Sequence, residues 1–193
     1  MENSSTGKSG LSPKTLRLVE SAIMLALATA LSLVKIYQMP LGGSVTLCSM
    51  LPILLIGYKY GPKWGLLTGF TYSVIQLLLD FSAVLSWGLT PTAVVVSFLL
   101  DYLVAFTFLG LAGIYGKGFW KFLGGMTTAV ALRYLSHVVA GATAYVSFVP
   151  KEWGVHAWAY SFAYNAFLLP DFAICAVVGA LIFKPLQRFL QTA

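Results

Sequence analysis

Long apolar runs separated by short polar turns dominate the chain. The runs are continuous rather than alternating, which is typical of membrane-spanning helices and not of β-barrel strands. The pattern predicts six spans at about 16–34, 45–57, 64–79, within 82–114, 122–148 and 157–183. The second run is short for a span, so it is either tilted, partly re-entrant or extended into the preceding loop. The fourth is expected to break, or to follow a loop, near Thr90-Pro91.

The composition supports an all-α integral membrane protein. Hydrophobic residues make up 59% and charged residues 9% of the chain, whereas soluble domains carry about 25% charged residues. We expect a disordered cytoplasmic tail at 1–14 and one six-helix transmembrane domain at 15–193. Cys48 and Cys175 lie in apolar segments, so buried thiols are expected there rather than a disulfide or a metal site.

The basic residues predict the orientation. Nine Lys and Arg residues fall on the side of the N-terminus and two on the opposite side, with Arg133 left inside a helix. Because cytoplasmic loops carry the excess of Lys and Arg, both termini are predicted to be cytoplasmic, in a plasma membrane.

Four ionisable residues fall at membrane depth: Asp101, Arg133, His137 and Asp171. Such residues are costly in lipid and usually face a cavity or a partner. Counted at about 1.5 Å per residue, Asp101 and His137 can line one cavity that opens to the outer half. Two alternatives stay open: a structural ion pair of Arg133 with Asp101 or Asp171, and a His137 that merely bonds between helices.

Aromatic and amide groups accompany these residues. Gly141 and Tyr145 continue the helical face of Arg133 and His137. Near the start of the last span lie Tyr160, Ser161, Tyr164 and Asn165. Aromatic faces attract cations, and amides bond the edge of a flat heterocycle, so the lining predicts a small aromatic cation as ligand. Aromatic residues at span ends are assigned to the membrane interface: Tyr60, Trp64, Trp120 and Trp153.

Two further features each have two interpretations. The Gly-rich outer segment 39–44 is either a mobile lid or a plain connector. Ala22, Ala26 and Ala30 repeat every four residues, which favours close approach of another helix, either within the chain or from a docked partner.

Several short motifs recur in one order along the spans: GGSVTL at 42–47, MLPI at 50–53, LDYL at 100–103, RYLSH at 133–137 followed by Gly141, and YS, YN and LLPD at 160–171. With them, the chain after Lys14 resembles the thiamine-specific substrate-binding (S) component of energy-coupling factor transporters. The resemblance implies a six-helix fold with an outer pocket closed by the loop between the first two helices. It also implies a transmembrane coupling subunit and two ATP-binding cassette ATPases as partners, no cofactor in this chain, and a family alanine motif for docking at Ala22, Ala26 and Ala30.

The resemblance also implies individual binding roles. The family's acidic residue and following tyrosine match Asp101 and Tyr102, and its histidine with a basic neighbour matches His137 and Arg133. The stacking aromatic matches Tyr145, where some relatives have Trp. Some relatives have Glu at 101 and Lys at 133, and Trp87 is a candidate for an aromatic residue that relatives supply from a loop. The full predicted substrate-binding set is Asp101, Tyr102, Arg133, His137, Tyr145, Tyr160, Tyr164, Asn165 and Asp171.

The sequence thus predicts a high-affinity thiamine-binding subunit that performs no chemistry. An S component for another vitamin or precursor, such as hydroxymethylpyrimidine, riboflavin or biotin, is the alternative of the same class. An intramembrane enzyme is disfavoured, because HExxH, GxSxG and Walker patterns are absent from the sequence. A helical scaffold would show no saturable binding of a small molecule.

Overall fold

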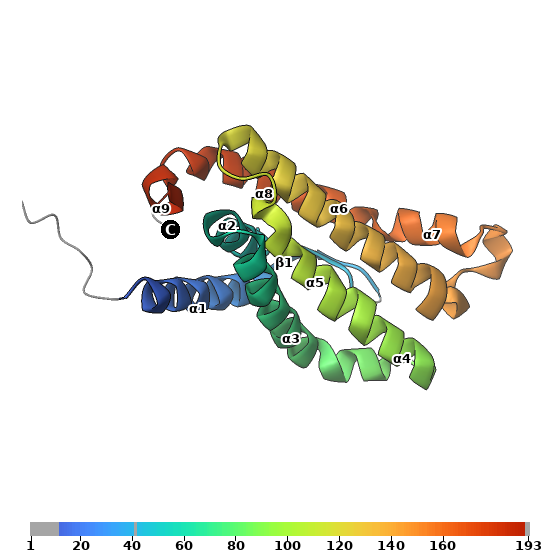
Figure 1. The fold of residues 1–193 in the computed structure, drawn as a ribbon. Helices are drawn as coiled ribbons and strands as arrows, with labels where there is room; N and C mark the ends of the chain where they lie inside the picture. Colours follow the sequence, from blue (N-terminus) through green and yellow to red (C-terminus); the bar gives the residue numbers. More distant parts are fainter. Residues whose placement is uncertain (1–11, 41, 192–193) are drawn as a thin grey trace, which may run out of the picture.

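The computed structural model describes residues 12–40 and 42–191 as a helical bundle with one short hairpin (Figure 1). The elements, in chain order, are α1 (Pro13–Ser32), β1 (Lys35–Gln38), β2 (Ser44–Thr46), α2 (Leu51–Tyr60), α3 (Pro62–Ser86), α4 (Pro91–Ser97), η1 (Phe98–Val104), α5 (Ala105–Thr107), η2 (Phe108–Gly113), α6 (Phe119–Ala144), η3 (Val146–Phe148), η4 (Lys151–Trp153), α7 (Ala157–Tyr164), η5 (Asn165–Phe167), α8 (Leu168–Phe183) and α9 (Gln187–Gln191).

The six predicted spans are present in the predicted order. Four continuous helical segments are long and apolar enough to cross a membrane: Pro13–Ser32, Pro62–Ser86, Pro91–Gly113 and Ala157–Phe183. Helix α6 has 26 residues, about 39 Å at 1.5 Å per residue, but carries polar groups. Helix α2 has only 10 residues, in keeping with the short second run. Of the predicted tail, residues 1–11 lie outside the described residues, while Pro13 and Lys14 already belong to α1.

Proline and glycine set the breaks between the helices. The Thr90 side chain accepts a hydrogen bond from the Ala93 N–H at 3.3 Å, and Pro91 opens α4. A threonine cap followed by proline is a strong helix start, so the predicted interruption near these residues is confirmed. Between α2 and α3, Gly61 has a φ of 82° and is followed directly by Pro62. The chain therefore reverses there without a loop.

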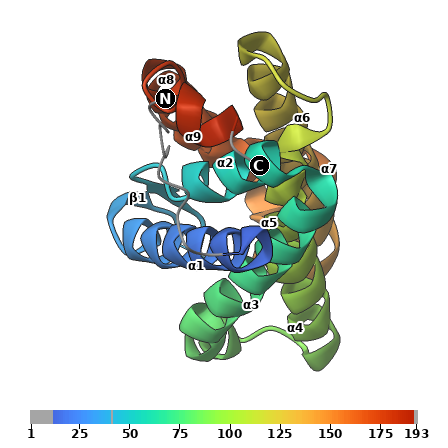
Figure 2. The same cartoon turned by 60° about the vertical axis from the view of Figure 1, so that its left-hand side comes forward.

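The predicted Gly-rich connector forms an antiparallel hairpin of β1 and β2, which lies beside α1 (Figure 2). Its turn is closed by the Met39 N–H, which donates to the Gly43 carbonyl at 2.6 Å. Gly42 has a φ of 93° and packs so closely on Trp87 that a Cβ would lie 2.6 Å from the indole ring. A Cβ on Gly43 would lie 2.5 Å from the Phe167 ring. The hairpin tip is thus pressed between the end of α3 and η5.

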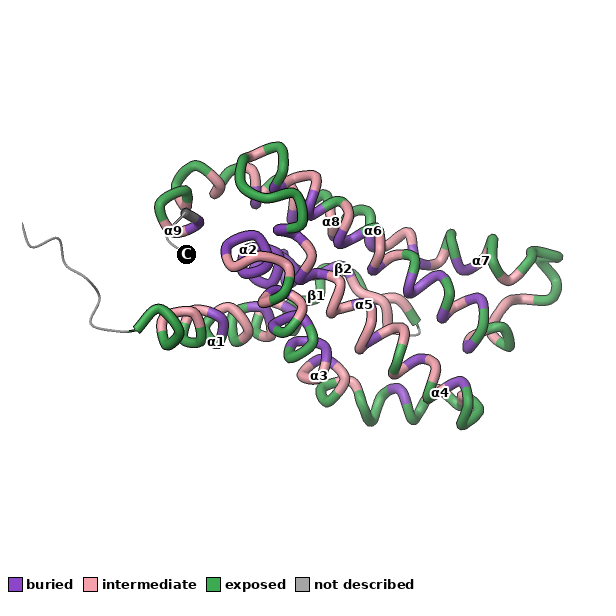
Figure 3. The backbone as a smooth tube through the Cα atoms, viewed as in Figure 1, coloured by how far each residue is buried: buried purple, intermediate pink, exposed green. Residues whose placement is uncertain are grey.

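Helix α2 lies at the centre of the bundle and is buried along almost its whole length (Figure 3). Glycines let the neighbouring backbones touch. A Cβ on Gly57 would lie 2.5 Å from the Gly110 carbonyl oxygen, and Gly65 and Gly110 meet backbone to backbone. On the other side, Gly125 of α6 packs directly on the Ala112 carbonyl. At these glycines there is no room for a side chain.

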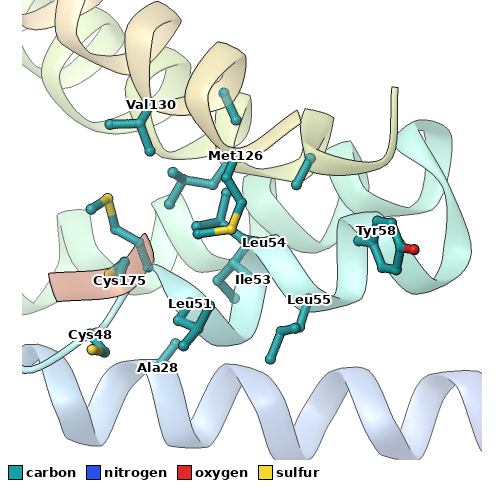
Figure 4. Packing of buried hydrophobic residues seen from close by; sticks show 14 of the residues in the cluster. Ala28, Cys48, Leu51, Ile53, Leu54, Leu55, Tyr58, Met126, Val130 and Cys175 are labelled. Atoms are coloured by element: carbon teal, nitrogen blue, oxygen red, sulfur yellow. The ribbon is translucent and has the colours of Figure 1, made fainter. Parts of the chain in front are cut away.

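A hydrophobic cluster joins α2 to α1, α6 and α8. Figure 4 shows Ala28 of α1 close to Leu51 of α2, with Met126 of α6 on the far side. Cys48 and Cys175 belong to the same cluster and are buried free thiols, which confirms the predicted burial. Ala22, Ala26 and Ala30, by contrast, are exposed on α1, so their small side chains do not serve packing within this chain.

Polar contacts tie the elements together at the end where α1 begins and α9 lies. The Lys117 ammonium donates to the carbonyls of Tyr58 at 3.0 Å, Lys59 at 2.7 Å and Leu190 at 3.3 Å. Burial, and then the charge of Lys59, lower the pKa of Lys117. Lys59 itself donates to Glu20 at 2.6 Å. Lys117 thereby connects the last turn of α2 to α9.

Candidate functional site

A cavity of about 140 Å³ lies beneath the β1–β2 hairpin, between α3, the α4–η1 segment, α6 and α7. A single water needs roughly 10–15 Å³, so the space suits a small organic molecule. All nine residues of the predicted substrate-binding set line this cavity, and so do Trp87 and Gly141. The predicted convergence of the fourth, fifth and sixth spans on one hollow is therefore confirmed.

A directed chain of hydrogen bonds runs along one wall. Arg133 Nε donates to His137 Nε2 at 3.3 Å, and His137 Nδ1 lies 2.8 Å from Asp101 Oδ1. Because Nε2 accepts, the imidazole proton is on Nδ1, the ring is neutral, and Nδ1–H donates to the carboxylate. His137 therefore orients the Asp101 carboxylate by a hydrogen bond and brings no positive charge to it.

The second oxygen of Asp101 is held as well. Ser97 Oγ donates to Asp101 Oδ2 at 3.2 Å and lies 2.7 Å from the Tyr145 hydroxyl. Since the single Ser97 proton is used on Asp101, Tyr145 is the donor to Ser97. Asp101 belongs to the π-helical segment η1, one helical turn beyond Ser97. Such segments are frequent at functional sites because their wider turn redirects side chains.

The opposite wall is built by the contact of α6 with α7. Gly141 has no side chain and lets Ser161 of α7 approach its backbone, and Ser161 Oγ donates to the Val138 carbonyl at 2.8 Å. Asn165 Nδ2 donates to the Ser161 carbonyl at 2.9 Å and to the His137 carbonyl at 3.3 Å. The amide nitrogen of Asn165 is thus occupied by the protein, which leaves its carbonyl oxygen to accept from a ligand.

Aromatic rings complete the walls and the mouth. Tyr160 and Tyr164 stack with their centroids 6.2 Å apart and their planes at 27°. Trp87 lies 6.2 Å from Tyr145, so the two rings stand together at the rim. Trp87, the candidate loop aromatic, therefore does reach the cavity. Trp153 and Trp120 are exposed, Trp120 to 80%, whereas Trp64 donates to Ser21 of α1 at 2.9 Å.

Asp171 lines the cavity, but its hydrogen bonds go to the β1–β2 hairpin. Its Oδ1 accepts from the Thr46 backbone N–H at 2.9 Å and from Thr46 Oγ1 at 3.1 Å. Thr46 Oγ1 also lies 2.7 Å from Ser49 Oγ. The carboxylate of α8 thereby anchors the end of β2.

The Arg133 guanidinium is buried and only partly satisfied. It lies over the Phe106 ring, 4.2 Å from its centroid, and its Nη1 has no hydrogen-bond partner in the described part of the chain. No nitrogen of Arg133 lies within 4.0 Å of a carboxylate oxygen of Asp101 or Asp171. The alternative of an ion pair between Arg133 and either residue is therefore wrong. Among residues 12–40 and 42–191, the ion pair is Lys59–Glu20, while the neutral His137 ring meets Asp101 by a hydrogen bond. A buried donor without a partner is rare, so Arg133 offers Nη1 to a ligand.

Other lining residues were missed by the sequence reasoning. Asp80 lines the cavity near the end of α3 and accepts from the Tyr102 hydroxyl at 3.2 Å. The polar residues Ser32, Thr46, Ser49 and Gln76 also line it. An acidic residue within the apolar run 77–85 was the available signal for Asp80. No described group of three or more His, Cys, Asp or Glu could hold a metal ion, and the lining suits an organic ligand.

Comparison with known proteins gives one consistent family. The sequence model of the family described as Thiamine transporter protein (Thia_YuaJ) matches residues 18–191. The thiamine transporter ThiT of Bacillus subtilis (strain 168) is 36% identical over 197 aligned positions, which cover 94% of this chain and 97% of the relative. The thiamine transporter ThiT of Lacticaseibacillus paracasei is 24% identical and covers 90% of each chain.

A solved structure has the same fold. The structure of ThiT from Listeria monocytogenes matches with a TM-score of 0.75, covering 93% of this chain and 100% of that one at 21% identity. This likeness confirms the predicted fold.

Proposed function

Because the chain belongs to the thiamine transporter protein family, we propose that it is the thiamine-binding S component of an energy-coupling factor importer. It captures thiamine from outside in the cavity beneath the β1–β2 hairpin and delivers it to an ATP-driven partner module. It performs no chemistry on the vitamin and needs no cofactor, since ATP is used by the partners.

One observation carries the proposal: a carboxylate fixed by two donors inside an aromatic cavity at membrane depth. The Asp101 side chain is 15% exposed and is oriented by His137 and Ser97. An ionised group is costly at that depth unless a partner compensates it. Since His137 is neutral, a positive charge on the ligand is the missing partner. A quaternary thiazolium beside aromatic rings meets this requirement without a proton.

The remaining contacts suit the two rings of thiamine. Tyr145 and His137 hold the ring faces. The free carbonyl oxygen of Asn165 accepts from the exocyclic amine of the pyrimidine, with Tyr160 at the same edge. Arg133 Nη1 donates to an acceptor on the ligand. Tyr102 and Tyr164 complete the wall.

The β1–β2 hairpin acts as the lid. Its glycines pack on Trp87 and Phe167, which stand at the mouth of the cavity. Asp171 holds its second strand by the hydrogen bonds to Thr46. Opening therefore requires the tip to leave two aromatic rings, while the strand end stays anchored.

The proposed partners are a transmembrane coupling subunit and two ABC-type ATPases. The exposure of Ala22, Ala26 and Ala30 on α1 supports a docking role, because small exposed side chains allow another helix to approach closely. Within this chain α1 uses a different residue, Ala28, for its packing.

The proposed orientation puts both termini in the cytoplasm of a cell with this protein in its plasma membrane. Lys59, Lys117 and Glu20 meet at the end of the bundle where α1 begins. The basic residues of the inner turns therefore gather at one end, and the connection from α3 to α4 lies toward the other (Figure 1); Trp87 of the cavity lining belongs to this connection. The positive-inside rule then makes the first end cytoplasmic.

Ligand titration of the purified protein in detergent tests the function. We expect saturable binding of thiamine at one site, with quenching of Trp87 fluorescence that is lost in Trp87→Phe. Riboflavin and biotin should not compete. Hydroxymethylpyrimidine, which lacks the cation, should compete weakly. Equal binding of thiamine and hydroxymethylpyrimidine would contradict the role of the charge, and absence of any saturable ligand would favour a scaffold.

Reconstitution tests the partnership. Vesicles that contain this chain alone should bind labelled thiamine without accumulating it. Accumulation should require the coupling subunit, both ATPases and ATP. Uptake by the isolated chain would contradict the proposed division of labour.

A further inference from the structure

Asp80 is a third acidic residue of the cavity wall, besides Asp101 and Asp171, and it lies on a helix for which the sequence predicted no ligand contact. It lies on α3, six residues before its end at Ser86, and lines the cavity beside Leu79. The Tyr102 hydroxyl donates to Asp80 Oδ2 at 3.2 Å. Because Tyr102 directly follows Asp101 in η1, this contact ties α3 to the segment that carries Asp101.

The charges of the lining are not balanced. The described lining residues include three carboxylates, Asp80, Asp101 and Asp171, and two cationic groups, Lys35 and Arg133. With His137 neutral, one negative charge is in excess. A ligand with a single positive charge would balance it.

Asp80 is the carboxylate with the fewest compensating contacts. Asp101 receives two hydrogen bonds and Asp171 receives two from Thr46, while Asp80 receives one, from a neutral phenol. No described cationic group lies within 4.0 Å of it. Lys35, the cation of the β1–β2 hairpin, is exposed, so water already screens its charge.

We propose that Asp80 is a second countercharge for the cationic ligand, and that together with Asp101 it sets the preference of the cavity for a cation over a neutral molecule of the same shape. This inference rests on the proposed function, since it concerns the same cavity. Asp80 on α3 and Asp101 on η1 spread the negative potential along the wall that these two elements form. A flat cation between them gains from both, whereas an uncharged ring gains from neither.

The test compares two ligands on the Asp80→Asn variant: thiamine, and its neutral isostere in which a thiophene ring replaces the thiazolium. Coulomb attraction from a partly buried carboxylate predicts a loss of thiamine affinity of roughly three- to tenfold. Affinity for the neutral isostere should stay within about twofold, because shape and hydrogen bonding are retained. Asp80→Glu, which keeps the charge, should retain the preference for thiamine over the isostere.

Two results would overturn the proposal. Equal weakening of both ligands by Asp80→Asn would mean that Asp80 only positions Tyr102, and Tyr102→Phe would then reproduce the loss. Unchanged thiamine affinity would mean that Asp101 alone supplies the countercharge. Failure of the unmodified chain to bind thiamine would instead contradict the proposed function, so the two failures are distinguishable.

Discussion

The half of the molecule that contains α9 and the half that contains the cavity are packed in different ways. Toward the end with α9, helices α2, α3, η2 and α6 touch through glycines, and backbone packs on backbone at Gly57, Gly65, Gly110 and Gly125. Toward the other end, α4 and α7 each pack on α6 (Figure 1). There the helices meet through polar side chains around the cavity.

Because of this difference, one half mainly stabilises the fold and the other mainly binds the ligand. Close-packed interiors respond to even one added methylene, so the glycine-packed half fixes how the helices cross. The cavity half is held by single hydrogen bonds, each worth about 0.5–1.5 kcal/mol, and can readjust around a ligand. Substitutions should therefore affect folding in one half and binding in the other.

The largest effect should come from adding one carbon to the glycine-packed half. Gly124 and Gly125 are neighbours in α6, but only Gly125 abuts a backbone carbonyl, while a Cβ on Gly124 would lie 3.6 Å from the Tyr115 ring. Overpacking predicts that Gly125→Ala costs about 3 kcal/mol, which lowers the midpoint of thermal unfolding by roughly 6–12 °C. Gly124→Ala should be neutral or slightly stabilising, because alanine favours helix.

The measurement is thermal unfolding in detergent, followed by circular dichroism, for both variants. Similar midpoints for Gly124→Ala and Gly125→Ala would contradict the view that the close backbone contacts fix this half.

The next largest effect should appear in binding alone. Asp101→Asn removes the charge that His137 and Ser97 orient, so thiamine affinity should fall at least tenfold, about 1.4 kcal/mol. Isothermal titration calorimetry measures this directly, and Asp101→Glu, which keeps the charge, is the matched control. An unchanged dissociation constant, or a loss of folded protein comparable to that of Gly125→Ala, would break the separation of the two halves.

The smallest effect concerns the lid. Thr46→Val removes the hydroxyl that donates to Asp171 but keeps the backbone N–H bond. Loss of one hydrogen bond of about 0.5–1.5 kcal/mol should speed the dissociation of thiamine roughly two- to tenfold. Stopped-flow tryptophan fluorescence follows the release, and Thr46→Ser retains the hydroxyl as control. Identical release rates for Thr46→Val and the unmodified chain would show that the strand end is held by packing instead.

The spans and most of the binding set could be predicted from the sequence, because apolar runs and ionisable residues at membrane depth are strong signals. Asp101, His137 and Asn165 were expected to meet, and they do. The second span was expected to begin near Val45, and this boundary is wrong, because Ser44–Thr46 form strand β2 and α2 begins at Leu51. An apolar run does not by itself distinguish a buried strand from a helix start.

Asp80 was not predicted to line the cavity, for a related reason. The third span was expected to end at about Leu79, yet α3 continues to Ser86. Asp80 is therefore inside the helix, on the side that faces the cavity. The hydrogen bonds of Asp171 to Thr46 were also beyond sequence reasoning, since they join residues 125 positions apart.

The direction in which Asp101 points depends on the number of residues in the π-helical segment η1. Each helical residue advances the direction of the side chains by about 100°. Removing one of the residues between Ser97 and Asp101 would rotate Ser97 and α4 relative to Asp101 and break the hydrogen bond between Ser97 and Asp101, although both side chains would still be there. Ligand recognition therefore depends partly on the number of residues in this segment. A deletion there should reduce ligand binding more than many single side-chain substitutions would.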